Sequence, residues 1–432
     1  MKVAFDLRPL QIGHQYRGIG ICLQNILKHL QTKPEIIKHW DLVFYIYNNR
    51  PMPSILNGYS VPHRIIGTRE ILPPSGRFMP IRYLKGAYAF WRKANSIDHL
   101  PEISTMDTFV QFDFLLGVPS HPNVRSILLK YDIIPLVFEY QYLPTFKQVR
   151  ARTNNIRLAI NAQRHRSHYL WLLRKSLRRA GLVLAISEHT KHDLIAYLNA
   201  DEKKIKTLSL AADNLMSSLT RESKDKLFWS IDWRFIPSQK RYRSSSITDK
   251  PYLLYMGGSD HRRRIQDLVF AYNILRAEGI DCALMLAGFD FQDLNTIPSE
   301  DVREALRYSS YSDDIYCLGF VSPEDKNLLY RHAIAFVYPT LYEGFGLPVL
   351  EAMQQGCPVV CYDNSSLAEV GGNAALYAKG LEEIAVVIKN LLADKKLRTQ
   401  VIAAGKKQAK KFSWAKTSSR FVKLIDTPDT ES

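Results

Sequence analysis

The segment 338–353 holds the residue types best suited to chemistry in this sequence, and it reads Tyr-Pro-Thr-Leu-Tyr-Glu-Gly-Phe-Gly-Leu-Pro-Val-Leu-Glu-Ala-Met. Two glycines allow the backbone to approach a ligand closely, and Pro348 suits the first residue of a helix. Amides at the start of that helix lack partners within it and lie at the positive end of its dipole, so they predict an anion site. The carboxylates of Glu343 and Glu351 flank this site, and each can accept two hydrogen bonds from a vicinal diol. A nucleotide sugar offers this arrangement, with phosphate between two polyols.

Each of the two glutamates also has a structural alternative. We expect Glu343 in the loop before the helix and Glu351 in the first helical turn, where the helix dipole alone favours a carboxylate. Glycines ahead of a proline-started helix are likewise common turn chemistry. The whole string from Glu343 to Glu351 is far more specific than either residue, and it favours a functional site.

The elements around this segment alternate between β and α. Strands are predicted in the first half at 3–7, 42–47, 126–131 and 182–186, with an amphipathic helix at 21–30. The pattern restarts with strands at 252–256, 282–287, 314–318, 333–337 and 358–362, and with helices at 265–278 and 348–355. Such alternation predicts doubly wound parallel sheets, whose ligands bind at the carboxyl ends of the strands. The predicted fold class is α/β, with two Rossmann-like domains that face a central cleft.

A chain of 432 residues is too long for one hydrophobic core. We predict an N-terminal domain at 1–216 and a C-terminal domain at 250–412. The β-α pattern weakens at 217–249, which we interpret as a connector or insertion. The last segment, 413–432, is predicted as a helix with apolar side chains available to pack back on the first domain.

The glutamate segment resembles the paired-glutamate motif of retaining glycosyltransferases of family 4 (group 1), which have the GT-B fold. The resemblance spans most of the chain. Its other motifs are Arg17-Gly18-Ile19-Gly20, Tyr131-Asp132-Ile133-Ile134-Pro135, Ala185-Ile186-Ser187-Glu188, Tyr255-Met256-Gly257-Gly258-Ser259-Asp260, Leu318-Gly319-Phe320-Val321 and Gly356-Cys357-Pro358.

The resemblance implies that the domain at 1–216 lies on the acceptor side and that the domain at 250–412 binds the nucleotide sugar. It also implies a role for each matching residue. Glu343 is expected to bind hydroxyls of the donor sugar, and Glu351 to bind the ribose diol. The remaining donor-binding residues that it implies are Gly344, Phe345, Gly346 and Leu347 at the diphosphate, Gly257 and Gly258 in the turn, Gly319 and Val321 near the base, and Gly18 and Gly20 in a loop that closes on the donor from the first domain.

Members of this family usually place an Arg-Lys pair after the Gly-Gly turn, facing the diphosphate. By alignment to that turn, Arg262 stands at the Arg position and Arg263 at the Lys position. A guanidinium can neutralise a leaving diphosphate bidentately, and a cation so placed stabilises the charge that develops in the transition state. We therefore predict a catalytic role for Arg263 and donor binding for Arg262, with a solvated basic loop as the alternative. Arg264 stands where the family often has Asn, and we expect it to be exposed.

A second departure from the family pattern concerns Tyr131 and Asp132, because relatives commonly have His-Asp there. Tyrosine cannot carry the positive charge of a histidine. Either its hydroxyl supplies a similar hydrogen bond in the sugar-transfer site, or the acceptor site has diverged. Asp132 either orients a neighbour or caps a loop. Both residues are predicted as catalytic.

The bulk composition limits the cellular setting more than the reaction. The formal net charge of +16 fits nucleic acid, an anionic membrane surface or phosphorylated small molecules. Five scattered cysteines suit a reducing compartment. The chain start does not read as a signal peptide, and no stretch approaches the roughly 20 apolar residues of a membrane-spanning helix. We expect a soluble, cytoplasmic protein.

Two segments mix basic and aromatic residues, at 77–93 and 150–179, and the second has nine Lys or Arg and no acidic residue. Such mixtures suit the surface of an anionic membrane, so peripheral contact at its inner face is one hypothesis. A solvated basic helix face is the alternative. Nucleic acid is not expected as a partner, since the stacking and helix-turn-helix signatures are missing.

The function predicted is retaining transfer of a hexose, of mannose or glucose type, from a nucleotide sugar to a saccharide or lipid-linked acceptor, in cell-surface polysaccharide synthesis. No Asp-x-Asp metal clamp is evident at a strand end, so we expect no metal and no cofactor. The alternatives are another enzyme on the same fold, such as a nucleotide-sugar epimerase or a phosphosugar synthase, and a nucleic-acid-binding protein.

Overall fold

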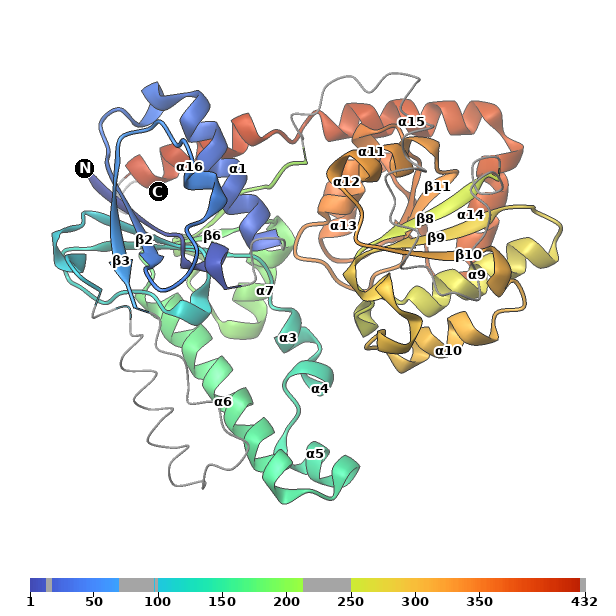
Figure 1. Ribbon diagram of the computed structural model, residues 1–432, viewed down its shortest axis with the longest axis horizontal. Coiled ribbons are helices and arrows are strands. Elements are labelled where there is room, and N and C mark those ends of the chain that lie inside the picture. Colours follow the sequence, from blue (N-terminus) through green and yellow to red (C-terminus); the bar gives the residue numbers. More distant parts are fainter. Residues whose placement is uncertain (13–17, 70–96, 98–99, 213–249, 428–432) are drawn as a thin grey trace. The chain divides into compact units, whose positions relative to one another are not determined.

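A computed structural model describes residues 1–12, 18–69, 97, 100–212 and 250–427 of the chain (Figure 1). Contacts divide the chain into two compact units. Unit 1 consists of Met1–Leu210 and Trp414–Ser432, and unit 2 of Ala211–Ser413. The predicted connector at 217–249 and the basic segment at 77–93 lie outside the described residues.

Unit 1 is built on a parallel sheet of seven strands in the order β3-β2-β1-β4-β5-β6-β7. Its strands are β1 (Lys2–Asp6), β2 (Asp41–Tyr47), β3 (His63–Thr68), β4 (Thr108–Gln111), β5 (Arg125–Lys130), β6 (Leu182–Ala185) and β7 (Ile205–Thr207). Its α-helices are α1 (Gly18–Thr32), α3 (Ile134–Val137), α4 (Glu139–Tyr142), α5 (Phe146–Thr153), α6 (Ile156–Arg179), α7 (Glu188–Leu198) and α16 (Trp414–Asp426). The central strands are buried on both faces, which explains their continuous apolar runs.

Unit 2 repeats this plan with six parallel strands in the order β10-β9-β8-β11-β12-β13. Its strands are β8 (Tyr252–Met256), β9 (Ala283–Ala287), β10 (Ile315–Gly319), β11 (Ala335–Tyr338), β12 (Val359–Tyr362) and β13 (Leu376–Ala378). Its α-helices are α9 (Ile265–Ala277), α10 (Glu300–Tyr308), α11 (Pro323–His332), α12 (Leu347–Gln354), α13 (Ser365–Gly371), α14 (Leu381–Ala393) and α15 (Lys395–Ala409). Helices cover both faces of each sheet (Figure 1).

The α/β class with two Rossmann-like parallel sheets is therefore confirmed. The strand predicted at 252–256 begins and ends as predicted, and the other predicted strands are shifted by one or two residues. Four strands were not predicted: β3, β4, β7 and β13. Three of these have only three or four residues, which is too short for a clear alternation.

The last helix, α16, belongs to unit 1 although it follows unit 2 in the sequence. Phe421 packs edge-on against Phe5 of β1, with ring centroids 5.8 Å apart. The Trp40 indole donates to Asp426, and the Arg125 guanidinium donates to the Ile425 carbonyl. Among the described helices, none combines the length and the apolar character needed to cross a bilayer.

Candidate functional site

The loops after β8 and β11 meet at the carboxyl edge of the unit 2 sheet. These two strands are neighbours where the strand order reverses, with Ala335 beside Leu253. Such a reversal is the usual ligand position in an open α/β sheet. The Leu341 amide donates to the Arg262 carbonyl at 2.7 Å and joins the two loops. The glutamate segment and the basic turn, some 80 positions apart in the chain, thus form one site.

Glu343 lies at the centre of this site and is only 8% exposed. Its Oε1 accepts hydrogen bonds from Arg262 Nη1 at 2.5 Å, from the Tyr338 hydroxyl at 3.0 Å and from Thr340 Oγ1 at 3.2 Å. Arg263 Nη1 lies 3.2 Å from the same oxygen. Burial alone would raise the pKa of Glu343, but the two guanidiniums outweigh it and hold the pKa below its usual value. The carboxylate is therefore ionised and oriented.

Arg263 reaches Glu343 both directly and through Tyr338. Its Nη1 donates to the Tyr338 hydroxyl, and its guanidinium lies 5.2 Å above the centre of that ring. A Cβ at Gly257 would stand 2.9 Å from Arg263 Nη1, so the turn after β8 leaves room for this guanidinium. Burial raises the pKa of Tyr338 well above its usual value, which keeps the hydroxyl protonated as a donor.

The backbone that leads into α12 fits an anion site, with a small correction. The helix begins at Leu347 rather than at Pro348, and Gly346 precedes it with φ of +104°. This left-handed conformation favours glycine. The loop is fixed by α13, because Ser365 Oγ accepts from the Glu343 amide and Ser366 Oγ donates to its carbonyl.

The prediction that Glu351 lies in the first turn of α12 is wrong. It is the fifth helical residue, and it faces α11. Its carboxylate accepts hydrogen bonds from Lys326 Nζ at 2.6 Å and from the Tyr330 hydroxyl at 3.3 Å. A diol that binds to Glu351 would thus meet an ammonium group as well.

The other predicted residues of unit 2 lie at the ends of strands. Gly257 and Gly258 follow β8, and Asp290 after β9 accepts from the Ser259 amide and hydroxyl. Gly319 ends β10 with φ of +66°, and Val321 follows it. Phe345 turns its ring into the core against Phe412, so only its backbone faces the site.

Arg264 is not the exposed residue that we predicted. It occupies the left-handed region, with φ of +49°, and pairs with Asp267 at 2.8 Å. Asparagine adopts this conformation more readily than most residues, which gives a reason for the Asn often found there.

In unit 1 the structure changes the interpretation of the predicted residues. Gly18 and Gly20 lie in the first turn of α1 and not in a loop. The Tyr131 hydroxyl is buried beside the Cys22 thiol of that helix, and burial raises the pKa of Tyr131 well above its usual value. Asp132, in the loop before α3, accepts a hydrogen bond from the Ile134 amide at 3.0 Å. The predicted hydrogen bond from Tyr131 to a sugar would need this side chain to move.

A buried polar cluster at the carboxyl edge of the unit 1 sheet was not predicted. Asp6 pairs with Arg8 at 2.6 Å and also accepts from Gln111 at 2.9 Å. Lys130 ends β5 with its ammonium 4.1 Å from the centre of the Phe114 ring. Burial lowers the pKa of Lys130 to about 8, although Asp132 and Asp113 oppose this shift. A charged residue at the end of the apolar strands β1 and β5 was the available signal.

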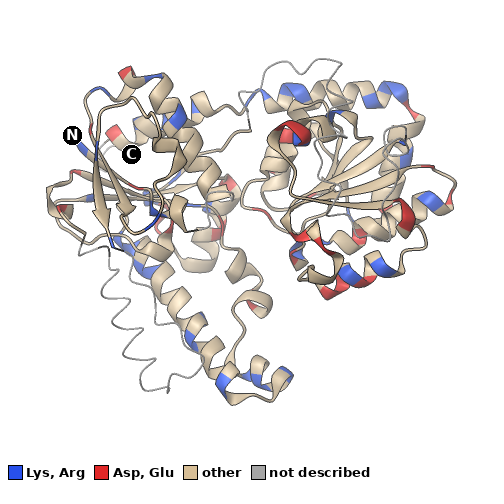
Figure 2. Ribbon diagram, viewed as in Figure 1, with Lys and Arg blue, Asp and Glu red and all other residues tan. Residues whose placement is uncertain are grey.

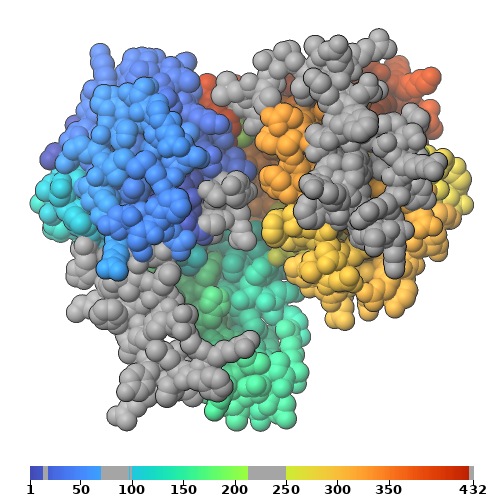
Figure 3. All heavy atoms as spheres, viewed as in Figure 1, coloured from blue at the N-terminus to red at the C-terminus, as the bar shows by residue number. Residues whose placement is uncertain are grey.

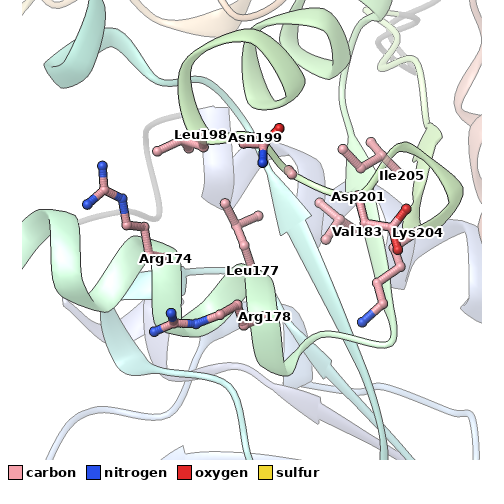
Figure 4. A pocket seen from close by; sticks show the side chains of 10 residues that line it. Arg174, Leu177, Arg178, Val183, Leu198, Asn199, Asp201, Lys204 and Ile205 are labelled. Carbon is pink, nitrogen blue, oxygen red and sulfur yellow. The ribbon is translucent and has the colours of Figure 1, made fainter.

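The residues missed in unit 2 are Tyr338, Thr340, Lys326 and Tyr330. Two of them lie inside the glutamate segment itself. Across the described ranges, no three His, Cys, Asp or Glu side chains are grouped so that they could hold a metal ion. A separate hollow of about 320 Å³ lies on unit 1, between α6 and the segment from Leu198 to Ile205 (Figure 4).

The C-terminal half of the chain matches a known family. Residues 238–408 match the family described as glycosyl transferases group 1. The O-antigen chain mannosyltransferase B of Escherichia coli is 34% identical over 257 residues, which cover 58% of this chain and 61% of that protein. The serotype-specific mannosyltransferase WbdA of the same organism is 27% identical over 68% of this chain and 32% of its own length. The matched part thus spans less than two thirds of these relatives.

Solved structures share the fold at low sequence identity. Anabaena HepE in complex with UDP and glucose has a TM-score of 0.65 at 14% identity, over 98% of this chain and 99% of that one. WaaG, a glycosyltransferase involved in lipopolysaccharide biosynthesis, has a TM-score of 0.59 at 14% identity, over 99% and 100% of the two chains. The resemblance to group 1 glycosyltransferases and the GT-B class of fold are confirmed.

Proposed function

We propose that this chain is a retaining glycosyltransferase that moves a hexose, most consistently mannose, from a nucleotide sugar to a saccharide or lipid-linked acceptor in cell-surface polysaccharide synthesis. The observation that carries the proposal is the buried, ionised Glu343 between two guanidiniums at the strand-order reversal of unit 2. The mannosyltransferase relatives support the choice of sugar.

The geometry suggests a division of work within the site. Glu343 has the charge and the orientation to accept hydrogen bonds from sugar hydroxyls. Arg262, Arg263 and the first amides of α12 offer positive potential to the diphosphate, whose charge grows as it leaves. Glu351 and Lys326 would bind the ribose, with the ammonium available to a neighbouring oxygen.

The first test is a thermal-shift screen with GDP, UDP and ADP and their hexose conjugates, followed by transfer from the donor that binds. We expect one nucleotide family to raise the unfolding temperature. The Glu351→Ala variant should lose this stabilisation, whereas Glu304→Ala, at an exposed position of α10, should retain it. Wild-type protein that no nucleotide stabilises would contradict the donor site.

We further propose that transfer requires no divalent metal, because arginines and helix amides can supply the positive charge that a metal gives in other transferases. Activity should persist in excess chelator. Strict dependence on added metal would overturn this part.

We also propose a cytoplasmic protein with peripheral contact to the inner face of an anionic membrane. All five cysteines are free and buried, which suits a reducing compartment. The basic helix α6 in unit 1 carries the proposed membrane contact, which would bring the enzyme to a lipid-linked acceptor.

Two other functions are less well supported. An epimerase or phosphosugar synthase would share the donor site but would yield no glycosylated acceptor, so product analysis separates them from a transferase. For nucleic-acid binding, only the net charge argues in favour. Salt-sensitive binding to duplex or single strands at physiological ionic strength would revive that alternative.

A further inference from the structure

Helix α6 has one buried and one exposed face, and the exposed face is basic. Its buried residues are Ala159, Tyr169, Leu173, Ser176 and Leu177. On the opposite side, residues at spacings of seven, four, three, four and three share one face of the helix. We call them the α6 stripe: Arg157, Arg164, His168, Trp171, Lys175 and Arg178. Helix α5 and the N-terminal part of α6 stand out from the body of unit 1 (Figures 1 and 3), whereas Tyr169, Leu173 and Leu177 of α6 belong to its core.

Negative charge is missing from this part of unit 1. Residues 146–179 contain ten Lys or Arg and no Asp or Glu, and Figure 2 shows α5 and α6 with blue segments only. Arg166 turns inward to pair with Glu139 at 2.8 Å. By contrast, the side chains of Arg157, Arg164 and Arg178 are exposed, and their guanidiniums make no ion pair or hydrogen bond to another described residue. Their charge therefore faces outward.

Trp171 stands in the middle of the stripe and is 39% exposed. Lys175 Nζ lies 4.7 Å from the centre of its ring, and the His168 ring lies parallel at 5.9 Å. A solvated basic face gains nothing from an exposed indole. At a membrane surface, however, an indole enters the interface while neighbouring cations meet lipid phosphates.

The hollow beside the C-terminal end of α6 has about the size of a lipid head group. Its floor includes Leu177, Val183, Leu198 and Ile205. Arg174, Arg178 and Lys204 bring positive charge to it, with Asp201 as the one carboxylate (Figure 4). Cations beside an apolar floor match a phosphate followed by the first carbons of a glycerolipid.

We propose that the α6 stripe is the surface by which this protein binds an anionic bilayer, with Trp171 at the interface and a lipid phosphate at the hollow. This assignment rests on the membrane contact proposed above and identifies the residues that make it. It involves no residue of the donor site, so lipid binding and sugar transfer can be tested separately.

The experiment is co-sedimentation of the full chain with vesicles of phosphatidylcholine and phosphatidylglycerol at 7:3, and with phosphatidylcholine alone. The wild type should bind only the anionic vesicles. The double variant Arg164→Gln/Arg178→Gln should bind roughly 30-fold more weakly, the effect of two cations at an anionic surface. The matched control, Lys395→Gln/Lys396→Gln, removes the same charge from exposed positions of α15 in unit 2 and should bind like the wild type.

Trp171→Phe supplies a second readout. Brominated acyl chains should quench part of the wild-type tryptophan fluorescence, and this part should be absent in the variant. Equal weakening in the stripe variant and the control would overturn the assignment and indicate an effect of net charge alone. A wild type that leaves anionic vesicles unbound would overturn it together with the membrane contact, whereas nucleotide binding would still report on the donor site.

Discussion

At the scale of single residues, Glu343 has the surroundings of a ligand-binding residue rather than those of a core residue. One of its oxygens is the shared acceptor for a guanidinium, a phenol and a hydroxyl. Removing a single partner from a buried ion pair leaves the remaining charge uncompensated. The donor sugar would therefore meet a group whose orientation is set before binding.

We expect Glu343→Gln to lower kcat/KM for transfer by at least about 100-fold, since a fixed charge is lost from the site. The unfolding free energy of unit 2 should fall by about 3 kcal/mol, because Arg262 and Arg263 stay buried without their counter-ion. Kinetics with labelled donor and urea unfolding measure the two effects. In the control variant Glu304→Gln neither quantity should change. A fully active Glu343→Gln would contradict a role at the sugar.

Lys130 permits a test by pH. Burial lowers its pKa to about 8 in the folded chain, against an unfolded value of 10.5. The folded state therefore holds fewer protons between these values, and its unfolding free energy rises with pH across that window. Relative to the wild type, Lys130→Met should be more stable by about 3 kcal/mol at pH 7, and the difference should vanish toward pH 10.5. Urea unfolding at several pH values measures this. A difference that is the same at every pH would count against the buried charge.

At the scale of elements, the start of α12 depends on a conformation that glycine adopts easily. Gly346 has φ of +104°, and a Cβ there would stand 2.8 Å from Leu367 Cδ2. Gly346→Ala should lower the unfolding free energy by about 1–3 kcal/mol. It should also weaken the nucleotide-induced thermal shift, since the helix amides would be displaced.

Gly380 offers the matched control because it also precedes a helix, α14, but has extended backbone with φ of −171°. Its Cβ would meet its nearest atom at 3.7 Å. Thermal unfolding with and without nucleotide should separate the two variants. Equal effects would show that the strain at Gly346 is unimportant.

The elements also show what the sequence could predict. The string from Glu343 to Glu351 identified a loop followed by a helix because glycine and proline act locally. The prediction that Glu351 lies in the first helical turn was wrong, because the helix begins at Leu347, directly after Gly346 with its positive φ. The burial of Tyr131 beside Cys22 joins two segments more than 100 positions apart, which no local pattern reports. Short strands such as β7 are specified by their neighbours in the sheet rather than by their own residues.

At the scale of the whole molecule, unit 1 is completed by α16. The helix α16 follows all of unit 2, yet its Phe421 is fully buried against β1, and Arg125 holds its last carbonyls. Unit 1 therefore cannot reach its final structure before α16 is available. Unit 2 has its own sheet and contains the residues proposed here to bind the donor, and α16 is not part of it.

This arrangement predicts separate responses of the two units. Phe421→Ala should lower the unfolding free energy of unit 1 by about 3–5 kcal/mol, the effect of deleting a buried aromatic ring. The nucleotide-induced rise in unfolding temperature should persist, because the unit 2 residues proposed to bind the nucleotide are unchanged. Calorimetry with and without nucleotide would resolve the two transitions, and Phe270→Ala, at a position 46% exposed on α9, is the control. Loss of nucleotide binding in Phe421→Ala would show that the donor site depends on an intact unit 1. A transition of unit 1 at its wild-type temperature would show that α16 contributes little to that core.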